Sequence, residues 1–568
     1  MCVFWIAAAL PPLSAWAGSP APATFRFESA LTKVFRDEPP PAGAARWEVS
    51  MARGEAESFQ LLITAGSAEL KSLSVRNVLP RKSALEAELS LAGYIRTVDN
   101  DRRPWARNEG KGKVGWWPDP LLPNRPFDLP ASETQPVWVT IHAPAGAPAG
   151  SHKARLEIRL DGKLLRKLDY TVRVFAVELP KQQQLRNASF MPAVHLSEHY
   201  KPQGGVAGPE FFQIYERWAR KAFSMHVGPT FDMMMGWSAL LDVPGGGSKL
   251  NEMRLGRTGT NLIWPMLGTP GQLDFSLVDR LGAVGREYGM KQFSIAVFDR
   301  RLPWEKYTDE LKQDLTGFLR AYAAHLRGKG MLQEAYVYNL DEPSPALFDT
   351  VRRNYELVKQ AVPDLKVWLC LNEPKGVTAL TGSTDIWDVY IRQYDQSGIE
   401  QHRRPQDQVI WAVCVWPHEH PNLFIEYPAV DARAIGWLTY SYGISGFEYW
   451  GLNYWGKNIG NRGWANFNGG DTRTSWQRTP WPWGDGWLLY PGENGEPLSS
   501  VRLENVRDGF EDAELLLLAS KGKKEEADRI ARMVAPSIEK FEKSPAAFEK
   551  AHVELLTALV RAGKPAGK

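Results

Sequence analysis

The sequence contains little cysteine. Three cysteines occur in 568 residues, and two of them, Cys370 and Cys414, lie in apolar segments typical of β-strands. The strand assignment given below places these two on the fifth and seventh strands of a barrel, about 10 Å apart. A disulfide requires Cα atoms within about 7 Å of each other. We therefore expect two buried free thiols and no stabilising disulfide.

The sequence also lacks an excess of charge of either sign. Its 68 basic residues are balanced by 65 acidic ones, which gives a formal net charge of +3. This balance argues against nucleic acid or an anionic membrane surface as the partner. No glycine-rich phosphate loop or dinucleotide-binding fingerprint is present, so we expect no cofactor. The composition does not indicate an oligomeric state.

Long hydrophobic runs are missing as well, and the one short run opens the chain. It leads to Ala15-Trp16-Ala17, a pattern typical of a signal-peptidase site. The run is too short to cross a bilayer. We expect residues 1–17 to be a cleaved signal peptide and the protein to be exported, to the periplasm or the extracellular space. No integral membrane segment is expected in the mature chain.

The remainder of the chain divides into three parts with different patterns. From 24 to 180, apolar and polar residues alternate, as in Lys153–Leu160, and Asp161-Gly162 marks a hairpin. This part predicts a β-sandwich accessory domain. From 185 to 496, strands alternate with amphipathic helices, which predicts a (β/α)8 barrel of the TIM type. For residues 497–568 the pattern predicts C-terminal helices that pack on the barrel. The predicted fold class is therefore multidomain α/β.

Eight strands are predicted for the barrel, separated by helices such as Pro209–Ser224, Thr308–Arg327 and Ser344–Val362. The strands are Leu185–Met191, His226–Met233, Lys291–Phe298, Ala335–Leu340, Leu365–Leu371, Ile386–Ile391, Val409–Trp416 and Gly446–Trp450.

The most informative segment lies at the end of the fourth predicted strand. An apolar strand runs into Asp341 and Glu342, Pro343 ends it, and Ser344 and Pro345 are suited to begin a helix. Barrel enzymes build their active sites at this end of the strands. Two adjacent carboxylates repel each other, which raises one pKa and provides a general acid. We predict that Asp341 and Glu342 are catalytic; the alternative is an ordinary acidic helix N-terminus.

Tryptophan is abundant, with 23 residues, many of them between Trp411 and Trp487. Sugars pack their C–H faces on exposed aromatic rings, although aromatic residues also fill cores. Because strand neighbours alternate sides, at least one of Tyr449 and Trp450 is expected in the barrel core. Asn339 is either a hydrogen-bonding partner of the pair or a simple strand-end residue. The predicted substrate-binding residues are Asn339, Trp416, His418, Tyr449, Trp450, Asn453, Tyr454 and Trp455.

Two histidine patterns in the sequence could form metal sites. His418 and His420 follow the seventh strand but lack an obvious third ligand. His195, Glu198 and His199 match the H-x-x-E-H pattern of zinc peptidases, which requires a regular helix. A strand just before and a proline shortly after leave room for at most one helical turn. We therefore expect a polar loop there and no metal site.

The segment Tyr338–Pro343 resembles the catalytic motif of glycoside hydrolase family 123, whose catalytic domain was long classed as a domain of unknown function (4091). Further blocks match in the same order, Gly446–Trp455 and then Gly484–Gly492, followed by Arg502–Asp512. The predicted sandwich resembles the accessory domain of the family more loosely. The resemblance covers nearly the whole mature chain.

The resemblance implies a retaining, exo-acting β-N-acetylgalactosaminidase with a glycan substrate. In such enzymes the 2-acetamido oxygen of the substrate attacks the anomeric carbon. Asp341 would then orient the acetamido group, and Glu342 would act as general acid and base. No second carboxylate across the bond is needed in that mechanism.

Glu448 departs from the family pattern, in which an apolar residue is expected. It either points outward or supplies a second carboxylate for a sugar without an acetamido group. Three alternatives therefore stay open: a glycosidase acting on such a sugar, a non-catalytic carbohydrate-binding protein, and a zinc peptidase built on His195, Glu198 and His199.

Overall fold

The computed structural model describes residues 22–97, 115–204, 209–229, 268–269, 272–273, 275–290, 293–296, 298, 303–414, 420–455 and 483–563. The expected signal peptide lies outside these residues, and so do Trp416 and His418 of the predicted site. None of the described helices is long and apolar enough to cross a membrane.

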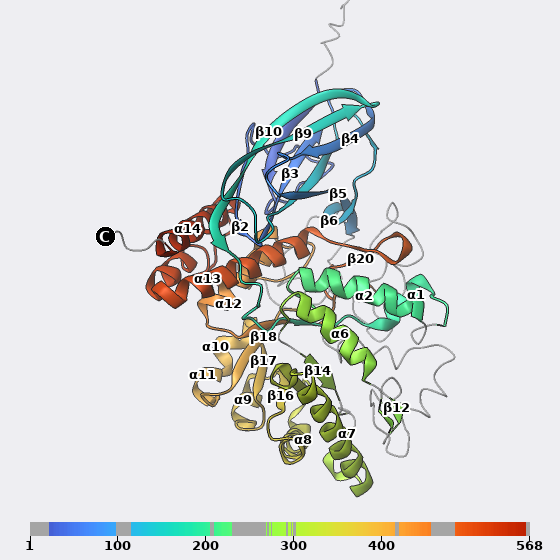
Figure 1. Ribbon diagram of the computed structural model, residues 1–568, viewed down its shortest axis with the longest axis vertical. Coiled ribbons are helices and arrows are strands. Elements are labelled where there is room, and N and C mark those ends of the chain that lie inside the picture. The colour runs from blue at the N-terminus through green and yellow to red at the C-terminus, as the bar shows by residue number, and fades with distance from the viewer. Residues whose placement is uncertain are drawn as a thin grey trace, which may run out of the picture.

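The N-terminal part is a β-sandwich of two five-stranded sheets (Figure 1). The sheet orders are β1-β3-β8-β5-β6 and β2-β10-β9-β4-β7, and every pairing within them is antiparallel except β2 with β10. Inward residues such as Phe59, Leu156 and Val172 form one shared apolar core. The strands are β1 (Thr24–Ser29), β2 (Glu48–Arg53), β3 (Ala56–Thr64), β4 (Leu70–Val78), β5 (Glu86–Thr97), β6 (Gly115–Pro123), β7 (Phe127–Leu129), β8 (Thr134–His142), β9 (Gly150–Leu160) and β10 (Lys163–Glu178).

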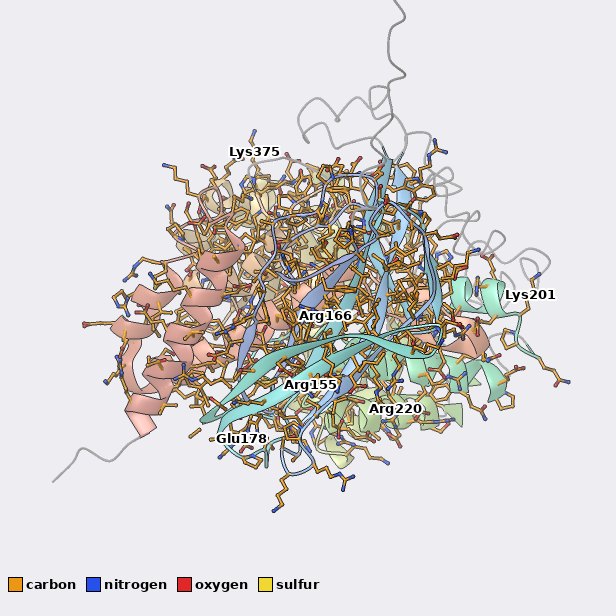
Figure 2. The ribbon with its side chains drawn as sticks, turned by 90° about the horizontal axis from the view of Figure 1, so that it is seen from above. Arg155, Arg166, Glu178, Lys201, Arg220 and Lys375 are labelled. Carbon is orange, nitrogen blue, oxygen red and sulfur yellow. The ribbon has the colours of Figure 1, made fainter. Side chains whose placement is uncertain are left out.

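The outer face of the sandwich is strongly charged. Figure 2 shows Arg155 and Arg166 extending from β9 and β10. Arg155 pairs across the two strands with Asp169, with 2.6 Å between its Nε and the carboxylate. This alternation of apolar inner and charged outer residues is the period-two pattern seen in the sequence.

The second part is a seven-stranded sheet in the order β11-β19-β18-β17-β16-β15-β14, with every pairing parallel. The predicted second strand is represented only by a parallel bridge between Ser189 and Pro229. Residues 226–228 form a turn and irregular backbone, so the predicted start at His226 is wrong, and residues 230–233 lie outside the described part of the chain. The described strands therefore form an open parallel arc, and its closure into a (β/α)8 barrel stays a prediction.

The strands of this arc are β11 (Ala188–Ser189), β14 (Phe293–Ala296), β15 (Ala335–Asp341), β16 (Lys366–Leu371), β17 (Ile386–Tyr390), β18 (Gln408–Ala412) and β19 (Gly446–Tyr449). The helices around it are α1 (Ala193–Tyr200), α2 (Pro209–Ser224), α6 (Ser276–Glu287), α7 (Asp309–Gly328), α8 (Phe348–Ala361), α9 (Pro374–Ala379), α10 (Tyr394–Ser397), α11 (Ile399–His402) and α12 (Ala429–Ser441). Short β-ribbons pair β12 (Gly268–Thr269) with β13 (Gln272–Leu273) and β20 (Tyr490–Pro491) with β21 (Pro497–Leu498).

Both faces of the parallel arc are buried, which explains why its strands are almost continuously apolar in sequence. Outward residues such as Val337 and Leu369 belong to the large core beneath the helices. Inward residues form a separate cluster that includes Tyr338, Trp368 and Cys370. Cys370 and Cys414 are both buried and free, as expected.

Helix α13 (Val501–Ala531) connects the two parts of the molecule. It packs against α12 of the second part and against β3 and β6 of the sandwich (Figure 1). Every residue from Val501 to Leu516 is buried. The backbones of α12 and α13 touch at two glycines, because a Cβ on Gly436 would lie 1.9 Å from the carbonyl oxygen of Gly509. The last helix, α14 (Pro545–Gly563), packs on β2 and β10.

The buried surface of α13 carries charges that are paired across the junction. Arg502 donates to both oxygens of Asp119 on β6, at 2.8 Å each. Arg433 of α12 is held between Asp512 of α13 at 2.7 Å and Glu57 of β3 at 2.6 Å. Buried guanidinium groups are tolerated because each meets carboxylates in a bidentate or bridging geometry.

His552 of α14 joins this network as a cation. Its Nδ1 lies 2.6 Å from Asp512 and its Nε2 lies 3.1 Å from the carbonyl oxygen of Ser50. Both neighbours are acceptors, so both ring nitrogens must carry protons. Burial alone would lower the pKa of His552, but Glu55, Glu57 and Asp512 outweigh it and raise that pKa to about 10.

We predict that His552→Gln lowers the free energy of unfolding by about 3–5 kcal/mol near pH 6, because it removes one of the two cations, with Arg433, that balance the buried carboxylates Glu55, Glu57 and Asp512. The pKa of His552 rises on folding from 6.5 to about 10. Its stabilising contribution is therefore complete below pH 6.5 and is lost as the pH rises to about 10. Denaturant unfolding should show a smaller difference in the free energy of unfolding between the wild type and His552→Gln at pH 10 than at pH 6. His152→Gln, at an exposed site in the sandwich, is the control. A difference that does not depend on pH contradicts the assignment.

Candidate active site

Strand β15 contains one extra residue just before the predicted catalytic pair. Tyr338 lies opposite Trp368 of β16, but Asp341 lies opposite Cys370, so β15 has two intervening residues where β16 has one. Regular alternation would place Tyr338 and Asp341 on opposite faces of the sheet. The bulge brings both to the inner face, where the Tyr338 hydroxyl donates to Asp341 Oδ1 at 2.9 Å.

Glu342 has a backbone conformation that is rare for a residue with a side chain. Its φ is 44°, in the left-handed region, and its side chain is exposed, whereas Asp341 is half-buried. The hydroxyl of Tyr390 on β17 donates to Glu342 Oε1 at 2.7 Å. Local strain of this kind is characteristic of functional sites. The two adjacent carboxylates therefore have different exposure and different hydrogen-bond donors.

The helix after the pair begins later than predicted. Ser344 is extended, and Pro345–Leu347 form one 3-10 turn before α8 starts at Phe348. Ser344 makes no side-chain cap hydrogen bond. The expected start of an α-helix at Pro345 is wrong, because the chain first takes a tighter turn beyond Pro343.

Strand β17 contributes two site residues that the sequence analysis missed. Asp388 and Tyr390 are two residues apart and therefore share the inner face, and Asp388 lies opposite Cys370. Burial, and then the charge of Asp341, raise the pKa of Asp388 well above its usual range. A possible signal was present in the sequence, since Asp388 is a single acidic residue inside an otherwise apolar strand, Ile386–Tyr390.

Glu448 points inward. On β19 it lies opposite Ala412 on one side and Ala188 on the other, and it is 5% exposed. Burial raises the pKa of Tyr338 well above its usual range, and the negative charges of Asp341 and Glu448 raise it further. Glu448 is therefore within electrostatic reach of the inner-face groups Tyr338 and Asp341, and the outward-pointing alternative does not hold.

Three residues predicted to contact substrate are built into the core instead. Tyr449 is fully buried, and its hydroxyl is hydrogen-bonded to the backbone of the turn 484–486. The indole N–H of Trp455 donates to a backbone carbonyl at 2.8 Å, and its ring is buried. Asn453 is fully buried and donates to the carbonyl oxygen of Pro192 at 3.1 Å. The sequence pattern could not separate aromatic residues that pack inward from those that face the opening.

Asn339 also differs from its predicted role. Its amide donates to the carbonyl oxygen of Val351 at 3.1 Å and accepts from Asn354 at 3.1 Å, both in α8. Asn339 is fully buried and lies on the outer face of β15, opposite in direction to Asp341. It therefore fixes α8 against the strand, and its side chain is turned away from the predicted substrate.

Trp450 and Tyr454 are half-buried at the end of β19, and their ring centres are 5.1 Å apart. Asp485 holds Trp450 by accepting its indole N–H at 2.7 Å. His195 of α1 extends the row, with its ring 4.6 Å from that of Tyr454. This row of rings fits the predicted stacking wall for Trp450 and Tyr454, which stays a prediction.

The H-x-x-E-H segment does form a helix, so the expectation of at most one turn was wrong. Helix α1 has eight residues, which places His195 and His199 one turn apart. His195, Glu198 and His199 nevertheless do not converge as a group of three ligands within the described part of the chain. The His195 ring packs on Tyr454 and the His199 ring on Trp455, and burial lowers the pKa of His199.

The described residues do contain one cluster with the spacing of a metal site. Candidate ligand atoms of Glu55, Glu57, Asp512 and His552 lie within 4.8 Å of one another. Both nitrogens of His552 face acceptors and so offer no lone pair, and Arg433 already supplies positive charge to Glu57 and Asp512. The cluster therefore fits the ion-pair network at the domain junction better than a metal.

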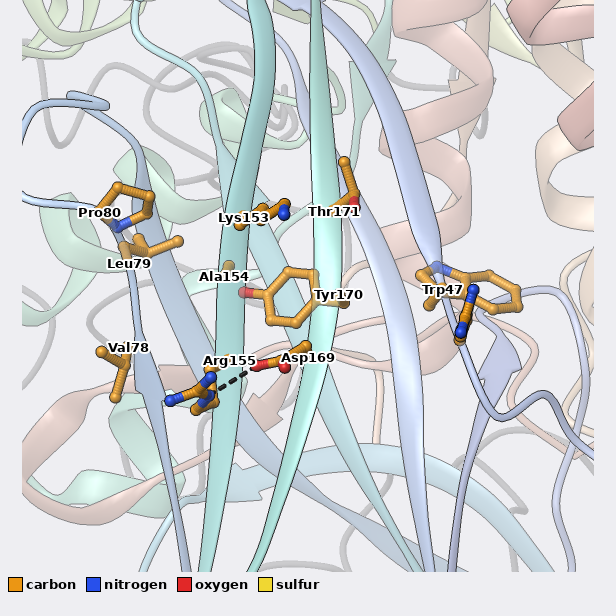
Figure 3. A pocket seen from close by; sticks show the side chains of 11 residues that line it. Trp47, Val78, Leu79, Pro80, Lys153, Ala154, Arg155, Asp169, Tyr170 and Thr171 are labelled. Atoms are coloured by element: carbon orange, nitrogen blue, oxygen red, sulfur yellow. Dashed lines mark hydrogen bonds and ion pairs between the residues drawn. The ribbon is translucent and has the colours of Figure 1, made fainter.

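A hollow of about 710 Å³ lies on the sandwich, over β9 and β10 (Figure 3). Its charged lining residues Arg155 and Asp169 are paired with each other, as Figure 3 shows. Trp47, at one side, is stacked on Phe59 of the core with ring centres 6.1 Å apart, so part of its surface is already covered. Neither Asp341 nor Glu342 lines this hollow, so it is separate from the predicted active site.

Comparison with known proteins identifies the family. Residues 259–519 match the model of the glycoside hydrolase 123 catalytic domain, and residues 28–160 match that of the glycoside hydrolase 123 N-terminal domain. No curated protein matches in sequence. The protein is a glycoside hydrolase. It belongs to glycoside hydrolase family 123.

Among solved structures, a family 123 glycoside hydrolase from Clostridium perfringens, reported in a study of glycolipid glycan hydrolysis, shares the fold. The TM-score is 0.63 at 12% identity, over 95% of this chain and 97% of that one. A family 39 glycoside hydrolase from Bacteroides cellulosilyticus WH2 gives a TM-score of 0.33 at 11% identity, over 77% of this chain and 80% of that one, which is too low to support an argument.

We predict that Tyr390→Phe reduces kcat/KM on a cleaved aryl glycoside about tenfold, because it removes a hydrogen bond to a charged group. Tyr355→Phe is the matched control, since the Tyr355 hydroxyl donates to Asp385 at 3.2 Å at a site away from Asp341 and Glu342. Steady-state kinetics of both variants check the prediction. Equal effects of the two substitutions contradict a specific role for Tyr390.

Proposed function

We propose that the protein hydrolyses a terminal β-linked 2-acetamido sugar, similar to N-acetylgalactosamine, by a retaining, substrate-assisted mechanism. Membership of family 123 establishes glycoside hydrolysis as the reaction class. The observation that carries the finer proposal is the contrast within the adjacent pair. Asp341 is half-buried on the inner face beside Tyr338, and Glu342 is exposed and bonded to Tyr390.

Asp341 is suited to hold the acetamido group. In substrate assistance the acetamido oxygen attacks the anomeric carbon, and the resulting oxazolinium ion carries positive charge. An ionised carboxylate on the inner face would accept the acetamido N–H and balance that charge. The hydrogen bond from Tyr338 favours the ionised form and fixes the orientation of Asp341.

Glu342 is suited to transfer the proton. As general acid it would protonate the glycosidic oxygen while the bond to the anomeric carbon breaks. As general base it would then take a proton from the water that opens the oxazolinium ring, which restores the acetamido group with retained configuration. Because the nucleophile belongs to the substrate, adjacent carboxylates can serve both steps.

The half-buried rings of Trp450 and Tyr454 would stack on the sugar. Trp416 and His418 stay proposed contacts that lie outside the described residues. The Clostridium perfringens family 123 enzyme is reported in a study of glycolipid glycan hydrolysis. Glycolipid glycans are therefore one class of substrate to test. An exported enzyme, as proposed from residues 1–17, would meet such glycans outside the cytoplasm.

A second candidate reaction is favoured by one observation, the inward position of Glu448. A second carboxylate inside the arc could act as a nucleophile on a sugar without an acetamido group. Against this, Glu448 is only 5% exposed. A nucleophile that is almost fully buried would have little access to the anomeric carbon, so substrate assistance by the more accessible Asp341 and Glu342 is the better supported mechanism.

The test is a panel of aryl β-glycosides derived from N-acetylgalactosamine, N-acetylglucosamine, galactose and glucose. We expect cleavage only of the 2-acetamido sugars. Glu342→Gln should lower kcat/KM on substrates with poor leaving groups by about 10²- to 10⁴-fold, the usual contribution of a general acid.

Glu373→Gln is the matched control, because Glu373 is an exposed glutamate just after β16, at the same end of the sheet. Glu448→Gln should lose less than about tenfold, since the proposed mechanism does not use it as a nucleophile. Near-normal turnover by Glu342→Gln, or cleavage of galactosides or glucosides that depends on Glu448, contradicts the proposal. Tight glycan binding without any turnover selects a carbohydrate-binding role.

A further inference from the structure

Asp388 is a third carboxyl group inside the arc, and neither its placement nor its role follows from the catalytic pair. It lies on the inner face of β17 and is fully buried. The register runs from Asp341 on β15 through Cys370 on β16 to Asp388 on β17. The three inner-face residues are therefore consecutive across the sheet, with Cys370 between the two carboxyl groups.

Asp388 has no counter-ion among the described residues. Neither of its oxygens meets a hydrogen-bond donor with bonding geometry there. The Cys370 thiol and the Trp368 indole would lower the pKa of Asp388, but burial, and then the charges of Asp341 and Glu342, outweigh them and raise that pKa. Arg392, which follows on the same segment, donates to Asn372 at 2.9 Å and lies over the ring of Tyr390 at 4.9 Å, and it forms no ion pair with Asp388.

The groups around Asp388 come from every strand packed against it. Strand β15 provides Tyr338 and Asp341, and Glu342 follows directly after it. The other strands provide Trp368 and Cys370 (β16), Tyr390 (β17), the apolar Ile410 opposite Asp388 (β18), and Glu448 (β19), whose charge acts on Cys370 and Tyr338. All the titratable members of this set are acids, phenols or a thiol. An ionised Asp388 would therefore have only repulsive or neutral neighbours.

Two carboxyl groups that compete for one proton leave it on the group whose ionised form is less well stabilised. Asp341 is half-buried and accepts a hydrogen bond from the Tyr338 hydroxyl at 2.9 Å, whereas Asp388 is fully buried and accepts none from described donors. The proton therefore belongs on Asp388, and the negative charge on Asp341.

We propose that Asp388 is a positioning residue that stays a neutral carboxylic acid in the working enzyme. By holding the proton of the Asp341–Asp388 pair, it keeps Asp341 ionised and fixed for the acetamido group. This role rests on the function proposed for Asp341. Asp388 itself need not touch the substrate.

The test compares Asp388→Asn, Asp388→Leu and Asp341→Asn in the full chain. An asparagine is neutral and polar, as the protonated acid is, so Asp388→Asn should lose less than about tenfold in kcat. A leucine of similar size is apolar and gives Asp341 no polar neighbour, so Asp388→Leu should lose about 10- to 100-fold in kcat with little change in KM. Asp341→Asn should lose at least as much as Asp388→Leu, because it removes the working charge. Thermal unfolding confirms that each variant is folded.

Infrared difference spectra give a readout that needs no substrate. At pH 7 the wild type and Asp341→Asn should both show a protonated-carboxyl C=O band that shifts in D₂O and is absent from Asp388→Asn. Subtracting the Asp388→Asn spectrum removes the bands of other buried acids. This measurement separates the inference from the proposed function, because it stands even if no glycoside on the panel is cleaved.

Two outcomes overturn the inference. The first is the absence of a band that disappears specifically in Asp388→Asn, which means that Asp388 is ionised. The second is a kcat of Asp388→Asn that is reduced as much as that of Asp341→Asn. A kcat of folded Asp388→Leu equal to that of the wild type would overturn the inference in the same way.

Discussion

The buried ion pair between Arg502 and Asp119 is the interaction on which the arrangement of the domains and the site depends. It joins α13 to β6 of the sandwich, and the same guanidinium donates to the carbonyl oxygen of Gly484 at 2.8 Å. Asp485, the next residue, holds the indole of Trp450. The domain junction therefore fixes the turn that positions an aromatic residue of the predicted sugar wall. Removing either charge would leave the other buried and unpaired, which is costly. The accessory sandwich is thus structurally coupled to the opening of the catalytic domain.

The second constraint is the bulge in β15. A regular strand would direct Asp341 toward the helices, as it does Asn339, whereas the extra residue directs it inward. The left-handed backbone of Glu342 then turns the next side chain toward Tyr390. Two adjacent carboxylates thereby receive different surroundings, and different surroundings allow different protonation states. This local distortion, more than the identity of the residues, makes the pair suitable for two chemical roles.

Much of the second domain was predictable because parallel strands are short apolar runs between amphipathic helices. The position of Asp341 and Glu342 at a strand end followed from the same pattern. The bulge was not predictable, since nothing in Tyr338–Asp341 marks an extra residue. Asp388 was missed because a single acidic residue within an apolar strand resembles a chance break in the hydrophobic pattern and does not indicate a site. The C-terminal helices were expected to pack on the barrel, but their sequence did not mark Arg502 and Asp512 as buried charges. Sequence patterns cannot distinguish a charge that meets water from one that meets a partner encoded hundreds of residues away, as Asp119 is.

The measurement that tests the central claim most directly is the rate of cleavage of aryl 2-acylamido glycosides as the acyl group is fluorinated from acetyl to trifluoroacetyl. Fluorine withdraws electrons from the acyl oxygen, so a substrate-assisted reaction must slow steadily along the series. The account predicts a steep decrease in kcat/KM with each fluorine, with Asp341 and Glu342 intact. A rate that does not change with fluorination would show that the acetamido oxygen is not the nucleophile, and would contradict the assignment of Asp341.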